Sequence, residues 1–87
     1  MTTAENWKAF DLAEWCLDLM ISYYAQQIHT ERQRPEPDYA LIAYWQLEQT
    51  HLDAERDALR ITDQANNERV FRAYGYLARD ILLGPLA

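Results

Sequence analysis

The first 60 residues of the chain contain one strong break in helical structure, the pair Pro35 and Pro37. A residue that precedes proline disfavours the α-helical conformation, so a first helix should end near residues 32–34. Thr2 and Glu5 have the spacing of a capping box, which places its start near Thr3. A helix of about 30 residues is roughly 45 Å long, whereas a compact chain of this size has a diameter of about 30 Å. The break therefore predicts an elongated molecule.

The remaining helix start and stop signals predict two further helices. Pro37 suits the first position of a second helix, with Asp38 adding negative charge near its N-terminus, and the pattern continues to about Ile61. Thr62 or Asp63 can cap a third helix, and Gly84-Pro85 should end it. We expect an all-α fold in one domain spanning residues 1–87. Its helices, at about 3–33, 37–61 and 64–83, should form a long antiparallel hairpin with the third helix packed on it.

Composition excludes several classes of protein. One cysteine among 87 residues allows no internal disulfide and no cluster of thiolates for zinc. A net charge of −6 argues against non-specific binding to DNA or to anionic membranes. The opening residues carry no basic targeting segment, and no apolar run approaches the roughly 18 to 20 residues that span a bilayer. We expect a soluble cytoplasmic protein without a cofactor.

The first helix is unusually apolar for a helix of a monomeric protein. Eleven of the fourteen residues from Leu12 to Ala25 are apolar, and the exceptions form one narrow stripe of Glu14, Asp18 and Ser22. Two neighbouring helices can cover only part of such a surface, and a symmetric dimer is the commonest way to cover the rest. The sequence therefore predicts a dimeric helical bundle. Its interface should contain Trp15, Leu19 and Tyr23, although a well-covered central helix with partly wet aromatic edges is an alternative.

No arrangement of residues predicts catalysis. Glu48 and His51 form a Glu-x-x-His pair of the kind found in ferritin-like di-metal sites. Folding back at the prolines should place Tyr24 and Met20 opposite this pair, so a metal site would need carboxylates from a second chain. We expect a solvated or hydrogen-bonded pair instead. His29 should lie too far along the hairpin to join His51, and Cys16 lies in an apolar stretch typical of a core thiol.

The third helix carries the strongest candidate for a binding site. A 3-4-3 spacing places four cationic or aromatic residues on one of its faces, and such side chains can grip carboxylates or phosphates. They are Arg69, Arg72, Tyr76 and Arg79. The charge is −7 over residues 1–55 and +1 over residues 56–87, which favours an acidic protein partner over nucleic acid. Internal pairing with Asp53, Glu55 and Asp57 is the plain alternative.

The sequence thus predicts a small non-enzymatic protein that acts by docking on a protein partner. Regulators, adaptors and inhibitors, including those of phages and mobile elements, occur in this range of size and charge. One alternative is a ferritin-like protein whose carboxylate and histidine metal site is completed by oligomerisation through Glu48 and His51. Another is a nucleic-acid-binding regulator that uses the third helix.

Overall fold

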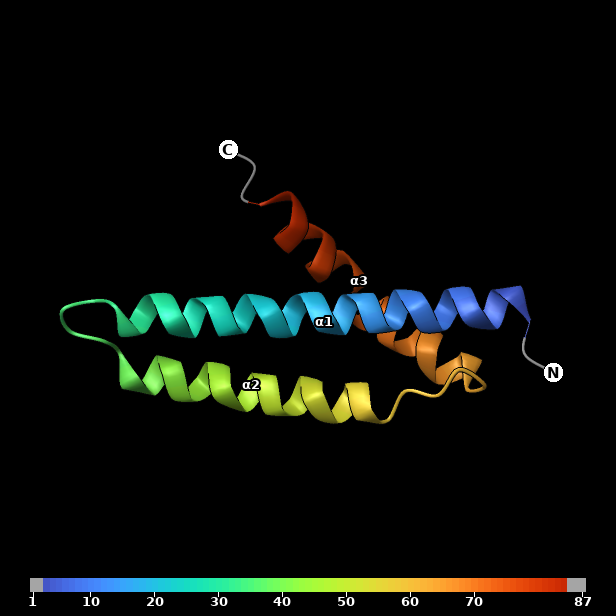
Figure 1. Cartoon of the computed structure of the whole chain (residues 1–87), viewed down its shortest axis with the longest axis horizontal. Helices are drawn as coiled ribbons and strands as arrows, with labels where there is room; N and C mark the ends of the chain where they lie inside the picture. The colour runs from blue at the N-terminus through green and yellow to red at the C-terminus, as the bar shows by residue number, and fades with distance from the viewer. Residues whose placement is uncertain (1–2, 85–87) are drawn as a thin grey trace.

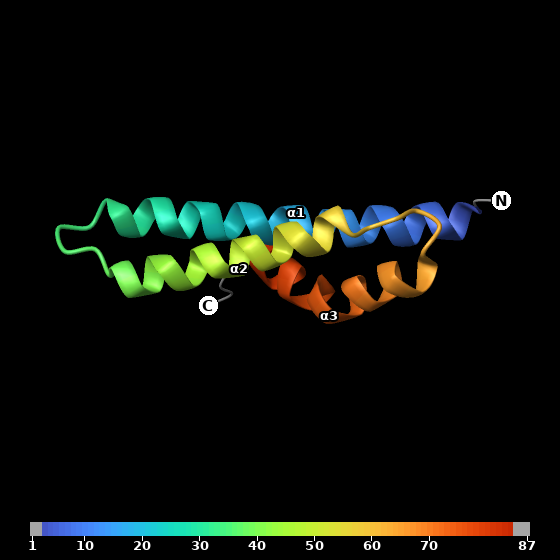
Figure 2. The same ribbon diagram turned by 90° about the horizontal axis from the view of Figure 1, so that it is seen from below.

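A computed structural model describes residues 3–84 and consists there of three helices, α1 (Ala4–Arg32), α2 (Tyr39–Asp57) and α3 (Gln64–Leu83). α1 and α2 run antiparallel along the long axis of the molecule, while α3 crosses α1 obliquely (Figures 1 and 2). The principal extents of the Cα trace are 54 × 30 × 15 Å, and its radius of gyration is 15.0 Å. A compact chain of this length would have a radius of about 12 Å. The elongated all-α architecture predicted from the sequence is therefore confirmed.

Short polar side chains start each helix. Thr3 caps α1 by accepting a hydrogen bond from the amide of Asn6, at 3.2 Å, so the cap lies one residue after Thr2, which is outside the described residues. Asp63 caps α3 in the same way, as predicted. Gly84 ends α3 with a φ of 74°, a conformation that glycine adopts without steric cost. The other half of the predicted stop signal, Pro85, is outside the described residues.

The predicted limits of the second helix are wrong at both ends. Asp38 is the N-cap of α2, because its carboxylate accepts from the amide of Leu41 at 3.1 Å, and Pro37 precedes the helix. α2 also ends four residues before Ile61. Beyond the end of the helix Leu59 is buried, and the guanidinium of Arg60 donates to the carbonyls of Asp57 and Leu59.

A buried carboxylate fixes the turn between α1 and α2. Glu31 is only 6% exposed although it is charged. It accepts a hydrogen bond from Arg34 at 3.0 Å and another from the backbone amide of Asp38 at 2.9 Å. The last turn of α1 is thereby tied directly to the N-cap residue of α2. No role for Glu31 was predicted from the sequence.

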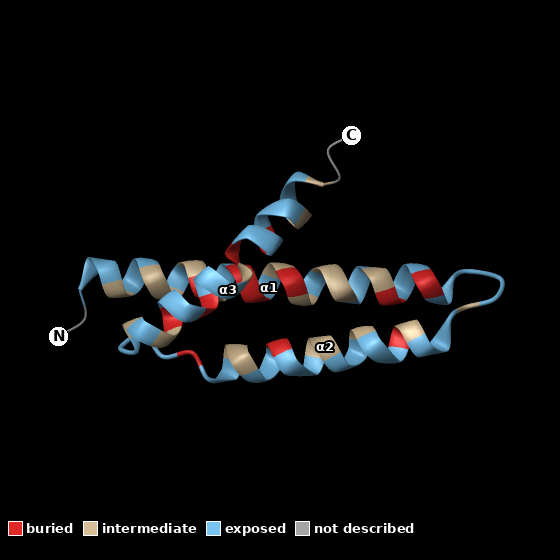
Figure 3. Cartoon of the chain, turned by 180° about the vertical axis from the view of Figure 1, so that it is seen from behind, coloured by how far each residue is buried: buried red, intermediate tan, exposed pale blue. Residues whose placement is uncertain are grey.

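The core lies where α3 crosses α1 and where the end of α2 reaches them (Figure 3). Aliphatic side chains, the thioether of Met20 and the single thiol form this core, and side chains with less than 2% exposure include Leu17, Leu52 and Val70. α2 and α3 each pack along α1. Between them, the two helices meet through polar contacts, Arg69 with Glu55 and Tyr74 with His51. None of the helices in the described part of the chain is long and apolar enough to cross a membrane.

Candidate functional site

A groove of about 830 Å³ lies between the N-terminal part of α1 and α3. α1 contributes residues spaced along one face, and α3 contributes residues from its first turn to its fifth. We refer to this surface as the groove. Its lining consists of Glu5, Lys8, Ala9, Leu12 and Trp15 from α1 and of Gln64, Glu68, Phe71, Arg72, Gly75, Tyr76 and Arg79 from α3.

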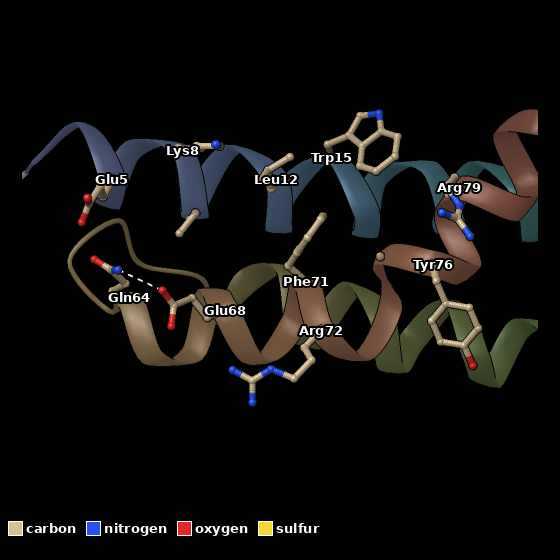
Figure 4. A pocket seen from close by; sticks show the side chains of 12 residues that line it. Glu5, Lys8, Leu12, Trp15, Gln64, Glu68, Phe71, Arg72, Tyr76 and Arg79 are labelled. Carbon is tan, nitrogen blue, oxygen red and sulfur yellow. Dashed lines mark hydrogen bonds between the residues drawn. The ribbon is translucent and has the colours of Figure 1, made fainter.

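Apolar side chains form the floor of the groove. Phe71 reaches from α3 toward α1 and lies near Leu12, whereas Arg72 and Tyr76 extend from α3 on the side away from α1 (Figure 4). Trp15 and Phe71 are each 39% exposed, so both aromatic rings present a face to solvent. The groove therefore offers aromatic and aliphatic contacts flanked by polar groups, which is the usual composition of a binding surface.

Gly75 shapes this floor. It is buried in α3, and a Cβ atom built on it would lie 3.2 Å from the ring of Phe71, one turn earlier in the same helix. The absence of a side chain thus lets the ring of Phe71 lie against the helix backbone. The close contact at Gly75 is therefore one between a ring and its own helix.

The cationic side chains of the groove have no anionic partners among the described residues. Ion pairs or hydrogen bonds occupy Arg34, Arg56, Arg60 and Arg69 elsewhere in the fold. Of the four remaining cations in the described chain, Lys8, Arg72 and Arg79 line the groove, and Arg32 lies at the end of α1. The chain carries fourteen carboxylates and eight Lys and Arg side chains, so unpaired cations gathered at one place stand out.

The predicted face of α3 is divided between two environments. Arg69 points toward α2, where its guanidinium pairs with Glu55 at 2.7 Å and also binds the side chain of Asn66. Arg72, Tyr76 and Arg79 line the groove instead. Of the four predicted residues, Arg69 is therefore paired internally, as in the alternative interpretation. The other three share the surface of the groove.

The residues predicted at an oligomer interface lie in two hollows of α1. Trp15 lines the groove, whereas Leu19 and Tyr23 are half-buried and line a smaller hollow of about 430 Å³ with Ile81 and Leu82 of α3. The hydroxyl of Tyr23 accepts a hydrogen bond from Gln27 at 2.7 Å. α3 therefore covers part of the surface that the sequence assigns to a second chain.

The polar stripe of α1 faces the end of α2. Arg56 pairs with Asp18 and lies 3.6 Å from Glu14. The hydrogen bond to Asp18 and the negative charge of that carboxylate raise the pKa of the Arg56 guanidinium. These carboxylates thus help to position α2 along α1.

Glu48 and His51 do not meet a third metal ligand. Among the described residues, no group of three or more His, Cys, Asp or Glu side chains is arranged to hold a metal ion. The Nε2 atom of His51 lies 3.3 Å from the hydroxyl of Tyr74. Glu48 lies near Tyr24, and burial and then the charge of Glu48 raise the pKa of the tyrosine. The side-chain amide of Gln49 donates to the backbone carbonyl of Ile21 at 3.3 Å, about two residues from the predicted register between the two helices.

The other two candidates for chemistry are separate from this pair. His29 is exposed on the last turns of α1. Cys16 is completely buried in the core, and burial raises the pKa of its thiol to about 11. The thiol therefore stays protonated and unreactive at neutral pH.

Eight of the twelve lining residues of the groove were not predicted as members of a site, among them Lys8, Leu12, Phe71 and Gly75. A glycine in the middle of a helix with an aromatic residue four positions earlier was the available signal. The register between α1 and α3 could not be read from the sequence, because no turn of fixed geometry sets how these two helices cross.

The comparisons with known proteins give no family or relative. No family model matches the sequence, and searches of curated proteins and of solved structures find no significant match. The geometry of the groove is therefore the basis for proposing a function.

Proposed function

We propose that this protein is a non-enzymatic interaction module that binds a segment of another protein in the groove between α1 and α3. Such a module would act as a regulator, adaptor or inhibitor, because a non-enzymatic protein exerts its effect by binding its partner. The cytoplasmic location expected from the sequence belongs to the same proposal.

The observation that carries this proposal is a gap in the helical packing beside α1. α2 reaches along α1 only as far as Asp18 and Glu14, where Arg56 pairs with both carboxylates. Beyond that point α3 is the one helix of the described chain that packs on α1. Helical bundles normally bury their apolar faces among three or four helices. The groove lies where a further helix would pack, and its floor leaves Trp15 and Phe71 partly exposed.

The residue types support protein recognition over catalysis. Tryptophan, tyrosine and arginine dominate the energetics of protein interfaces, because they bury large areas and keep polar groups at their ends. Trp15, Tyr76, Arg72 and Arg79 supply all three types within the groove. Its volume of about 830 Å³ also accommodates several anchoring side chains of a partner.

A selection from a displayed library of random peptides tests the proposal, because such a selection requires no identified partner. The wild-type chain is the bait, and selected peptides are then measured against Trp15→Ala and Tyr76→Ala. Both substitutions remove partly exposed rings from the groove, and each should weaken binding by about thirtyfold, the effect of losing an interface hot spot. Circular dichroism checks that both variants keep their helices.

The matched control is Leu47→Ala, because Leu47 is 70% exposed on α2 and is not part of the groove. The proposal is supported if the selected peptides bind Leu47→Ala as tightly as they bind the wild type and bind the two groove variants more weakly. Selected peptides that depend on Leu47 instead, or a selection that yields no binder sensitive to Trp15 and Tyr76, would contradict it.

A further inference from the structure

We infer that the segment bound in the groove is an acidic amphipathic helix. This inference rests on the proposed function and adds the chemistry of the partner to it. Three observations carry it: the unpaired cations around the groove, the length of the two helices that form it, and the distribution of charge along it.

The unpaired cations supply the charge complementarity. Lys8, Arg72 and Arg79 line the groove without a carboxylate within 4.0 Å in the described structure, although the chain as a whole has a net charge of −6. In the same fold, Arg56 and Arg69 find carboxylates on neighbouring helices. A partner with carboxylates at matching positions can form bidentate pairs with the two arginines, and such pairs fix its position and speed its association.

The dimensions favour a helical partner. The lining residues of α1 run from Glu5 to Trp15, and those of α3 run from Gln64 to Arg79. At a rise of about 1.5 Å per residue these segments are roughly 15 and 22 Å long. A partner helix of about 10 to 15 residues spans the same length. Its apolar residues at i, i+3, i+4 and i+7 would contact Leu12, Phe71 and Trp15, as in other complexes in which a helix lies in a groove.

The distribution of charge argues against a nucleic acid as the occupant. Glu5 and Glu68 lie toward one end of the groove and Arg79 lies at the other (Figure 4). A phosphate backbone carries charge along its whole length and would meet those carboxylates. A peptide helix can place glutamates beside Arg72 and Arg79 and leave uncharged residues beside Glu5 and Glu68.

Designed peptides test this inference directly. The first peptide has about 14 residues, enough for nearly four helical turns, with leucine or phenylalanine at the four anchor positions. Its other positions are glutamate in the half that would lie beside Arg72 and Arg79 and glutamine in the half that would lie beside Glu5 and Glu68. The second replaces every glutamate by lysine, and the third has the composition of the first in an order that destroys the apolar face. A single-stranded oligonucleotide serves as a polyanion without apolar anchors. Titrations followed by NMR report both the affinity and the amides that shift.

The acidic amphipathic peptide should bind and should shift the amide signals of Leu12, Phe71 and Gly75. The lysine peptide and the scrambled peptide should each bind at least about tenfold more weakly. Replacing Arg72 and Arg79 by glutamate should weaken binding by at least about tenfold. Arg32→Glu is the matched control, since Arg32 is an unpaired cation outside the groove, and it should leave the affinity within about twofold.

Three results would overturn the inference: equal binding of the lysine or the scrambled peptide, equal loss of affinity in Arg32→Glu, and displacement of the acidic peptide by the oligonucleotide at similar concentration. The library selection separates this failure from failure of the proposed function. Groove-dependent library peptides combined with no binding of the acidic peptide would reject the acidic helix alone. Absence of any groove-dependent peptide would reject both.

Discussion

Gly75 and Phe71 set the width of the groove at the scale of single residues. The nearest atoms to a Cβ built at Gly75 belong to the ring of Phe71, at 3.2 to 3.4 Å, so a methyl group requires the ring to move by a few tenths of an ångström. Phe71 is 39% exposed and has open space on the side of the groove. The ring can therefore move, and it moves into the space that a partner would use.

Gly75→Ala should consequently stabilise the fold while narrowing the groove. Alanine is favoured over glycine inside a helix by up to about 1 kcal/mol, and the displaced ring offsets only part of that gain. Urea unfolding should show a higher midpoint, and library peptides that depend on Trp15 should bind more weakly. A lower midpoint would mean that the ring of Phe71 is held in place more firmly than its exposure indicates.

Because the thiol of Cys16 is buried, we expect the free energy of unfolding to fall in alkaline solution. Burial raises the pKa of its thiol from 9.0 to about 11, so between these values the thiol of the unfolded chain ionises while the native thiol stays protonated. The contribution of Cys16 is fully present below pH 9 and is lost as the pH approaches 11, with a slope of up to about 1.4 kcal/mol per pH unit. Urea unfolding at a series of pH values measures this slope.

Cys16→Ala is the control for that measurement. It removes the ionisable group, so the slope between pH 9 and 11 should become shallower even if the smaller side chain lowers stability at every pH. The native pKa values of Tyr24 and Tyr74 are also raised by burial and by nearby glutamates, and their contribution at higher pH is common to both proteins. Identical slopes in the two proteins would contradict the assignment to Cys16.

At the scale of elements, Glu31 decides how α1 and α2 are joined. Glu31→Ala removes the acceptor of the Asp38 amide and the partner of Arg34. The side chain of Arg34 is 62% exposed and can return to water, so most of the cost comes from the backbone amide that loses its partner. We expect a loss of about 1–2 kcal/mol in the free energy of unfolding, measured by urea denaturation.

The control for this prediction is Arg34→Ala, which removes the ion pair and leaves the hydrogen bond between Glu31 and Asp38. An exposed ion pair contributes about 0–1 kcal/mol, so this variant should be affected less than Glu31→Ala. If both substitutions cost the same, the ion pair and not the backbone contact holds the turn.

The helices themselves were predictable to a large extent, and their crossing was not. Prolines, capping residues and Gly84 are local signals, and they placed the end of α1 and the whole of α3 correctly. The predicted end of α2 was wrong because residues 57–61 contain no proline or glycine that would mark it. The register of the hairpin follows from its short turn, which is why the proximity of Glu48 and Tyr24 could be predicted. No short turn fixes the position of α3 against α1, so the proximity of Phe71 and Leu12 could not be predicted from the sequence.

The elongated shape governs what the whole molecule exposes. With a shortest extent of 15 Å, much of each helix faces solvent, and large apolar side chains remain exposed on α2 as well as in the groove. Leu47 is 70% and Tyr44 is 54% exposed, more than Trp15 at 39%. Two surfaces are therefore available to a second copy of the chain, namely the predicted face of α1 with Trp15 and the outer face of α2 with Leu47.

The predicted homodimer is tested by light scattering coupled to size-exclusion chromatography over a wide range of concentration. We expect a mass twice that of the 10.3 kDa chain. Because a charge buried at an apolar interface is strongly unfavourable, Trp15→Glu should dissociate the dimer, and Leu47→Glu should leave it intact. A dimer that buries Trp15 covers part of the groove, so a peptide that binds the groove should compete with dimerisation and lower the mass to that of one chain. The reverse pattern would move the interface to α2 and leave the groove free in the dimer. A monomer at every concentration would contradict the dimer altogether, and Trp15 would then be exposed for a different protein.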